Sequence, residues 1–246
     1  MPYFNIVAET SENTVVTEYE PVKKRSDSYQ SEAALEQEFI RLLCEQGYEY
    51  LPIHTEKDLI ANLRMKLEEL NNYQFSDTEW DDFFKNAVAN PNEHIVEKTR
   101  KIQEDNVQVL TRDDGSSKNI TLIDKKNIHN NRLQVINQYK VNAFTENGAK
   151  HDNRYDVTVL VNGLPLVHIE LKRRGVAIRE AFNQINRYQR DSFWAGCGLY
   201  EYIQIFVISN GTNTKYYSNS TRRNAEKEHE KRGASKTKTS NSFEFT

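Results

Sequence analysis

Two stretches of β-forming residues joined by a turn constrain the fold of this chain more than any other feature. Residues 155–161 and 166–172 are rich in Val, Leu and Ile, and the sequence Asn-Gly-Leu-Pro lies between them. Asn-Gly between two such stretches is a strong signal for an antiparallel hairpin. The sequence therefore predicts two neighbouring strands that are connected by a tight turn.

The register of this hairpin decides which side chains meet. Glu170 and Lys172 are two residues apart and share one face, while the residues between and before them face the core. A two-residue loop would place Asp156 opposite Ile169. A three-residue loop or a single bulge would place Asp156 directly opposite Glu170, with β-carbons about 5 Å apart. Pro165 has no amide hydrogen for a ladder, which favours the irregular version.

Paired carboxylates of this kind are suited to hold Mg²⁺ against a phosphodiester. Magnesium prefers oxygen ligands and keeps several waters, one of which can act as the nucleophile. Lys172 is placed to orient that water or to offset charge on the phosphate. Without a metal the carboxylates of Asp156 and Glu170 repel each other, so one of them tends to stay protonated. The alternative is that the Asp and the Glu-x-Lys only belong to an ordinary solvated face of the hairpin.

Three further residues are candidates for the same site. Gln184 and Tyr188 are one turn apart on a helix predicted over 176–189, and the alternative for them is a helix face packed on the sheet. Glu36 lies on a helix predicted to follow Ser31 as its N-cap and to stop at Gly47. Glu36 is a candidate metal ligand, and Glu32, one turn earlier, is the alternative to it.

A local basic stripe follows the hairpin in a chain whose net charge is −3. Residues 172–191 contain six Lys or Arg against two acids, an excess of +4. Such a stripe attracts phosphates, and Arg173, Arg174 and Arg187 are the candidate contacts to a DNA backbone. The alternative is a solvated helix face.

The rest of the chain predicts an α/β fold with a mixed central sheet, flanking helices and a helical insertion. We expect a strand near 14–18, helices throughout 56–104 with Asp77 as one cap, and a hairpin of 107–111 with 120–124. Further strands are expected over 132–144, 202–209 and 215–218. Residues 1–218 form the predicted domain, and 219–246 a polar linker, mobile over 219–240.

Composition excludes several classes of protein. No apolar run is long enough to span a membrane, and the N-terminus lacks the pattern of a secretory signal. Two cysteines provide neither a disulfide framework nor the spacing of a zinc site. A reduced, cytoplasmic protein is the expectation.

Several of these stretches together resemble one family over most of residues 30–218. NRLQVINQYKVNAF, RYDVTVLVNGLPLVHIELKRRG and AFNQINRY are similar to the nuclease domain at the N-terminus of type I restriction enzyme R subunits. The family's first motif is an aspartate before the turn, matched by Asp156. Its Glu-x-Lys is matched by Glu170 and Lys172, and its Gln-x-x-x-Tyr by Gln184 and Tyr188. The family's first helix carries a glutamate near the site, which SEAALEQEFIRLLCEQGYEYL matches best at Glu36. Tyr155 stands where the name of the PD-(D/E)xK motif has proline.

The resemblance implies a restriction-endonuclease-like fold and the activity of a type I site-specific deoxyribonuclease. It implies Mg²⁺ as cofactor, with ATP used only by motor domains outside this chain, since no phosphate-binding GxxxxGK[ST] loop occurs here. Double-stranded DNA and the modification and specificity subunits are the implied partners. Two alternatives stay open: a free-standing repair or recombination nuclease of the same superfamily, and a DNA-binding or docking domain without catalysis.

Overall fold

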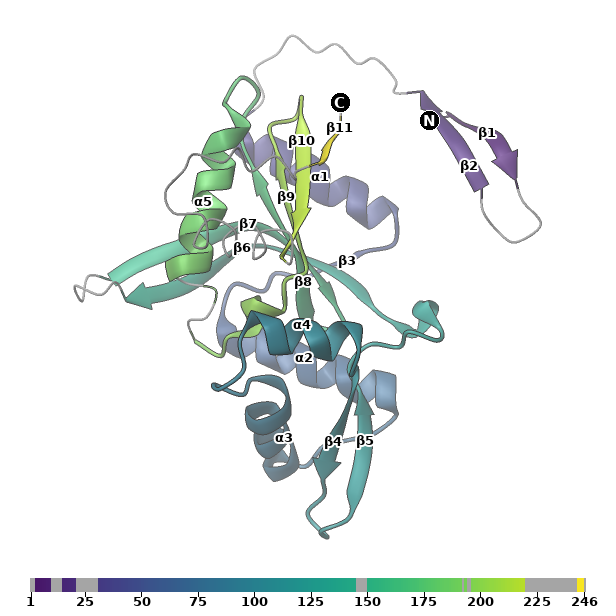
Figure 1. Cartoon of the computed structure of the whole chain (residues 1–246), viewed down its shortest axis with the longest axis vertical. Coiled ribbons are helices and arrows are strands. Elements are labelled where there is room, and N and C mark those ends of the chain that lie inside the picture. The colour runs from purple at the N-terminus through teal and green to yellow at the C-terminus, as the bar shows by residue number, and fades with distance from the viewer. Residues whose placement is uncertain are drawn as a thin grey trace, which may run out of the picture.

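A mixed sheet forms the centre of the molecule. The computed structural model describes residues 3–9, 15–20, 31–144, 150–191, 193, 196–219 and 243–245 (Figure 1). In this described part the large sheet has the strand order β11-β10-β9-β8-β7-β6-β3. The strands are β3 (Glu49–Tyr50), β6 (Leu133–Phe144), β7 (Lys150–Val161), β8 (Leu164–Leu171), β9 (Ile205–Ser209), β10 (Thr214–Ser218) and β11 (Phe243–Phe245).

The strand directions explain where helices are needed. β6, β7 and β8 are antiparallel neighbours, whereas β8 pairs in parallel with β9, and β3 with β6. Parallel neighbours cannot be joined by a tight turn and require a crossover. The connection from β8 to β9 contains α5 (Ile178–Asp191) and a short 3-10 helix, η3 (Leu199–Tyr202). The expected mixed α/β architecture is confirmed.

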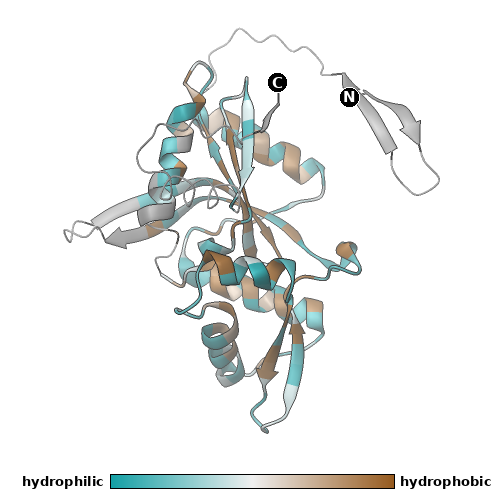
Figure 2. Ribbon diagram, in the orientation of Figure 1, coloured by the Kyte–Doolittle hydropathy of each residue, from teal (hydrophilic) through white to brown (hydrophobic). Residues whose placement is uncertain are grey.

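Helices cover both faces of the sheet. On one face α1 (Glu32–Glu45) packs Leu35, Phe39 and Leu43 against a cluster that includes Ile169 and Leu171. A larger core on the other face includes α5 and the helical block described next. Figure 2 shows hydrophobic residues concentrated along the central strands between these layers. Ser31 caps α1 as expected, since its hydroxyl accepts the N–H of Ala34.

The predicted helical insertion is present, with one corrected cap. It consists of α2 (Glu56–Asn71), α3 (Asp77–Phe83), a π-helical turn (Phe84–Val88) and α4 (Ile95–Gln103). Ser76, and not Asp77, caps α3: the Ser76 hydroxyl accepts the N–H of Glu79, and the Glu79 carboxylate accepts the N–H of Ser76. This reciprocal arrangement satisfies two helix-end donors, so Asp77 becomes the first helical residue.

Several boundaries differ from the sequence prediction. β4 (Val107–Thr111) pairs with β5 (Ser117–Thr121), so the second strand of this hairpin starts directly after the turn and not at residue 120. Residues 199–202 form η3, and β9 begins only at Ile205. A second short helix, η2 (Ile128–Asn130), precedes β6. The predicted strand near 14–18 corresponds to β2 (Val15–Glu20), which pairs with β1 (Tyr3–Glu9).

The C-terminal part of the chain is only partly described. Most of the predicted linker, residues 220–242, lies outside the described residues. β11 pairs with β10 at the edge of the large sheet. None of the helices in the described ranges combines the length and apolar character needed to cross a bilayer.

The turn between β7 and β8 is fixed by close contact with α2. Asn162 and Gly163 both have positive φ, 51° and 84°, which is the backbone of a tight hairpin turn. The buried Asn162 side chain accepts the N–H of Arg132 and donates to the carbonyl of Leu122. A β-carbon on Gly163 would lie 2.6 Å from Cα of Leu63 on α2. The hairpin is therefore held by backbone packing as well as by its own ladder.

We expect Gly163→Ala to lower the free energy of unfolding by roughly 3 kcal/mol, because it adds a backbone collision to an unfavourable positive φ. Gly115→Ala is the matched control: its φ is 81°, yet a β-carbon there meets nothing within 4 Å. The control should cost only about 1 kcal/mol. Urea denaturation of both variants measures the difference, and equal losses would contradict the close approach of α2.

Candidate functional site

The ladder between β7 and β8 brings the two predicted carboxylates opposite each other. The turn is the two-residue version, with Val161 paired to Leu164. The register then shifts between Val159 and Leu160, and Val157 pairs with Ile169. The ladder ends at this pair, and the same register carried one residue further sets Asp156 opposite Glu170. The bulge expected beside Pro165 is therefore present. It shifts the pairing by one residue relative to the register that a two-residue turn alone would give.

Asp156, Glu170 and Lys172 form one compact group. Glu170 is fully buried, and Asp156 is partly buried. The Asp156 carboxylate accepts the N–H of Leu171 at 2.9 Å, and the Lys172 ammonium donates to Glu170 Oε1 at 3.2 Å. The backbone N–H of Lys172 donates to the carbonyl of Ser209 on β9, which fixes the end of β8. The three side chains thus lie together as the sequence predicted.

The burial of this group makes ionisation of both acids unfavourable. Burial and, to a smaller extent, the nearby charge of Glu170 together raise the pKa of Asp156 to about 7. Burial also raises the pKa of Glu170 to about 7, against the opposing effect of the Lys172 ammonium. Two like charges in a site of low polarity favour the protonated forms. A bound cation would remove this penalty.

The donor set of the pair fits a hard divalent ion. Glu170 Oε2 is buried and has no hydrogen-bond partner among the described residues, although such oxygens are nearly always satisfied. Within the described ranges no group of three or more His, Cys, Asp or Glu side chains is arranged to hold a metal. Carboxylate oxygens such as those of Asp156 and Glu170 are the donors that Mg²⁺ prefers, and Mg²⁺ is commonly bound through one or two carboxylates while it keeps several waters.

Both candidate glutamates of α1 lie near the pair. The carboxylate of Glu36 accepts an amide N–H from Asn137 at 2.6 Å and another from Gln138. Burial raises the pKa of Glu36, and the charge of Asp156 adds to the rise. Glu32 accepts the N–H of Arg173 and its charge raises the pKa of Glu170. Glu36 is therefore near Asp156 and Glu32 near Glu170, and metal ligation by Glu36 stays a prediction.

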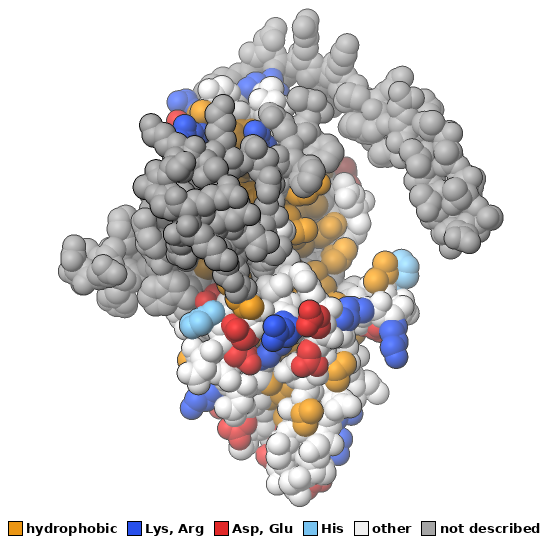
Figure 3. Space-filling view, viewed as in Figure 1, with side chains coloured by type: hydrophobic (Ala, Val, Ile, Leu, Met, Phe, Trp, Pro, Cys, Tyr) orange, Lys and Arg blue, Asp and Glu red, His pale blue; other side chains and the backbone are white. Residues whose placement is uncertain are grey.

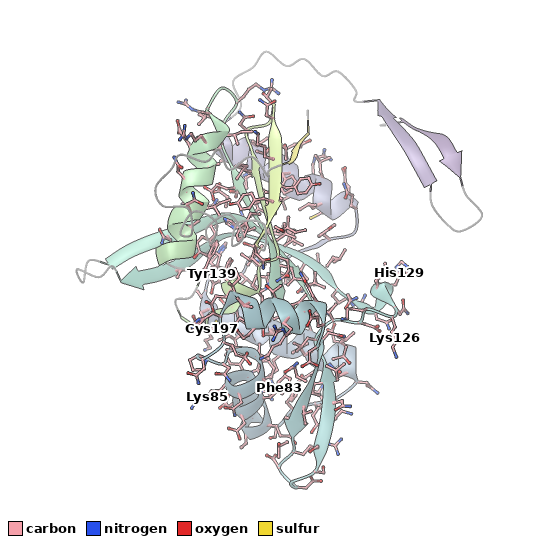
Figure 4. The ribbon with its side chains drawn as sticks, in the orientation of Figure 1. Phe83, Lys85, Lys126, His129, Tyr139 and Cys197 are labelled. Carbon is pink, nitrogen blue, oxygen red and sulfur yellow. The ribbon has the colours of Figure 1, made fainter. Side chains whose placement is uncertain are left out.

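Gln138 is a residue of this site that sequence reasoning missed. It has a φ of 53° within β6, a left-handed conformation that is costly for a residue with a side chain. The ladder of β6 with β7 skips it: Asn137 pairs with Val157 and Tyr139 with Tyr155. Beyond this kink Tyr139 joins the core on the opposite face from α1 (Figure 4). A glutamine in a strand-like stretch gives no sequence signal of such a kink.

Gln184 and Tyr188 connect α5 to β7 next to Asp156. The Gln184 amide donates to the Tyr188 hydroxyl, which donates to the carbonyl of Arg154 at 2.9 Å. The Tyr188 ring is buried, with its centroid 4.8 Å from that of Tyr155. These contacts correspond to the packed helix face that the sequence left as an alternative. A catalytic role for either residue stays a prediction.

Two of the three candidate DNA contacts lie in the connection between β8 and α5, and the third lies on α5. Arg173 and Arg174 directly follow β8 and are exposed, whereas the side chain of Arg187 on α5 lies outside the described ones. Figure 3 shows Lys and Arg side chains gathered at the end of the molecule where α5 begins. Lys126 and His129, by contrast, project from the η2 region, well away from α5 (Figure 4).

His168 is a second residue that the sequence did not indicate. It precedes Glu170 by two positions on β8, is fully buried, and its ring lies edge-on to Tyr155 with centroids 5.4 Å apart. Burial lowers the pKa of its imidazole to about 4. A histidine in an apolar stretch is usually an ordinary core residue, and only its tertiary neighbours distinguish this one.

Comparisons with known proteins point to one family. The profile described as "Type I restriction enzyme R protein N terminus" matches residues 29–225. The chain is 47% identical over 241 residues to the type I restriction enzyme EcoprrI endonuclease subunit of Escherichia coli, covering 98% of this chain and 70% of that protein. It is 40% identical over 196 residues to the SsaAORF53P endonuclease subunit of Staphylococcus saprophyticus, covering 78% of this chain and 20% of that protein. The chain is 30% identical over 203 residues to the HindI endonuclease subunit of Haemophilus influenzae, and the match covers 74% of this chain and 18% of that protein.

The raised pKa of Asp156 predicts a specific pH dependence of stability. The folded, metal-free chain holds a proton that the unfolded chain releases at its ordinary pKa of 3.8. The stabilising contribution is therefore full below about pH 4 and is lost as the pH rises through about 7. Asp156→Asn cannot ionise, so it should gain stability over the wild type by on the order of 4 kcal/mol between pH 4 and pH 8.

Urea denaturation with a chelator at pH 4, 6 and 8 measures this gain. His168 contributes in the opposite sense between about pH 4 and its ordinary 6.5. Both chains retain His168, so the comparison removes the effect of its burial, which is the larger cause of its lowered pKa. Asp82→Asn, at an exposed position of α3, is the matched control. A difference between Asp156→Asn and wild type that does not change with pH would contradict the burial of a coupled carboxyl pair.

Proposed function

The chain belongs to the family of type I restriction enzyme R protein N termini, and from this membership we propose that it is the DNA-cleaving domain of such a subunit. We infer a Mg²⁺-dependent nuclease of the PD-(D/E)xK type, with a restriction-endonuclease-like core. The relatives named above are endonuclease subunits, and the family match covers residues 29–225, which include all of the candidate residues.

The observation that carries the proposal is a set of two contacts around Glu170: the Asp156 carboxylate accepts the N–H of the next residue, Leu171, at 2.9 Å, and the Lys172 ammonium lies 3.2 Å from Glu170 Oε1. Asp156 and Glu170 would hold the cation, whose binding favours their ionised forms. A bound Mg²⁺ supplies Lewis acidity at the phosphate and makes a coordinated water more acidic. Lys172 would position the attacking water or stabilise the negative charge that develops on the phosphate.

The neighbouring residues have supporting parts in this proposal. Gln184 and Tyr188 would orient the site from α5 or contact the strand, and Glu36 would approach the cation from α1. Arg173, Arg174 and Arg187 would bind phosphates of double-stranded DNA, which fixes the position of the duplex without selecting a sequence. Target choice would then belong to the modification and specificity subunits, and ATP use to motor domains beyond this chain. Such an enzyme acts in the cytoplasm.

We expect isosteric changes at the three central positions to abolish cleavage and spare the rest of the enzyme. Asp156→Asn, Glu170→Gln and Lys172→Met, made in the complete enzyme with its partner subunits, should each reduce plasmid cutting by at least about 10²-fold. ATP hydrolysis and DNA binding should remain, because these residues are placed in cleavage alone. Cutting is measured on a plasmid that contains the target site.

Lys57→Met and Asp82→Asn provide controls of the same chemistry at exposed positions of α2 and α3. Both should cut as the wild type does. Retention of full cutting by any of the three site variants would overturn the assignment. A chain that binds DNA but shows no Mg²⁺-dependent change at Glu170 would instead be a docking module.

A further inference from the structure

A buried histidine lies beside Glu170 without a hydrogen-bond partner. His168 shares the sheet face of Glu170, since the two are two residues apart on β8. Three aromatic rings surround the imidazole edge-on, with centroid distances of 5.4 Å to Tyr155, 6.0 Å to Tyr188 and 5.6 Å to Phe193. Neither the side chain of His168 nor that of Glu170 has any exposed surface. The imidazole therefore has no access to bulk water.

The facing atoms of His168 and Glu170 are both unsatisfied. Nε2 of His168 lies 3.5 Å from Oε2 of Glu170. Neither atom has a partner with hydrogen-bond geometry among the described residues, although the Asp156 carboxyl lies close enough to Glu170 to lower the pKa of Glu170 through a hydrogen bond. The gap is too small for a bridging water and exceeds a good N–H···O distance by about 0.5 Å. A buried donor and acceptor left apart cost free energy, so a small movement that joins them is favourable.

We propose that His168 is a positioning residue for the metal site, whose neutral Nε2–H donates to Oε2 of Glu170. The inference rests on the proposed function. Lys172 already donates to Oε1, so a donor at each oxygen would fix the rotation of the carboxylate. Each carboxylate oxygen has a second acceptor site, and those sites remain available to a cation next to Asp156. Carboxylates that bind metals are commonly held by such outer hydrogen bonds.

The aromatic rings around His168 restrict the orientation of its imidazole. Tyr155, Tyr188 and Phe193 enclose the ring on several sides, so the imidazole cannot rotate freely to another acceptor. The hydroxyl of Tyr188 is itself directed to the carbonyl of Arg154. Glu170 is thus the acceptor that faces Nε2. Tyr188 would then contribute to the site as a wall of this enclosure.

Metal binding and stability should respond oppositely to loss of the imidazole. His168→Phe retains the ring shape and removes two unsatisfied nitrogens, so the metal-free 246-residue chain should unfold at the same or higher urea concentration. Its affinity for Mg²⁺, measured by calorimetric titration, should fall by about 10- to 100-fold. His168→Gln restores a donor near the position of Nε2 and should recover most of the affinity. A merely structural histidine would not give this opposition.

Phe83→Leu is the control because it removes a buried aromatic ring from the helical insertion, where Phe83 stacks on Phe75 with ring centroids 5.7 Å apart. It should lower stability and leave Mg²⁺ affinity near that of the wild type. A further measurement needs no variant: ¹⁵N NMR of the Mg²⁺-bound wild-type chain should show a neutral imidazole protonated at Nε2.

Two outcomes would overturn the inference alone: wild-type Mg²⁺ affinity in His168→Phe, or an imidazole protonated only at Nδ1. In either case Mg²⁺ binding by the wild type would leave the proposed nuclease function standing. Absence of Mg²⁺ binding by the wild type would overturn both.

Discussion

The burial of two carboxylates opposite each other is the constraint on which the rest of the structure depends. Asp156 and Glu170 lie in a part of the sheet where burial raises the pKa of both acids to about 7. Such a pair weakens a metal-free fold at neutral pH, and hydrophobic packing elsewhere must offset the cost. The apolar cluster between α1 and the sheet lies directly behind the pair, with Ile169 and Leu171 in it. The site is thus supported by core on the opposite face of the same strands.

Local irregularities of the backbone give the pair its geometry. The bulge after Pro165 sets the register, and the left-handed Gln138 interrupts the neighbouring ladder beside Asp156. Both features remove regular strand pairing, and both lie next to side chains that face the site. Bulges and strained residues of this kind commonly accompany functional sites, because they redirect side chains that a regular ladder would hold elsewhere. The close approach of α2 to Gly163 stabilises the hairpin in this form.

Much of the architecture followed from the sequence because the signals were local. A periodicity or a turn in the sequence identifies each of four elements. These are the helix after Ser31, the helical block of 56–104, the hairpin around Asn162 and Gly163, and the helix predicted over 176–189. Boundaries were less certain. Asp77 resembled a cap, but Ser76 forms the capping box, and the stretch from 202 was expected as a strand although its first part belongs to η3. Neighbouring polar residues compete for such positions, and tertiary contacts decide between them.

The sequence by itself determined that Asp156, Glu170 and Lys172 come from one hairpin, and that Glu170 and Lys172 share a face. It also limited the register to two possibilities. Only the tertiary structure decided between them, because a one-residue bulge depends on packing around the turn and not on residue type alone. The kink at Gln138, the amides that hold Glu36 and the aromatic enclosure of His168 likewise join residues far apart in the chain. Such contacts are set by how α1, α5 and the sheet pack together, so no local pattern encodes them.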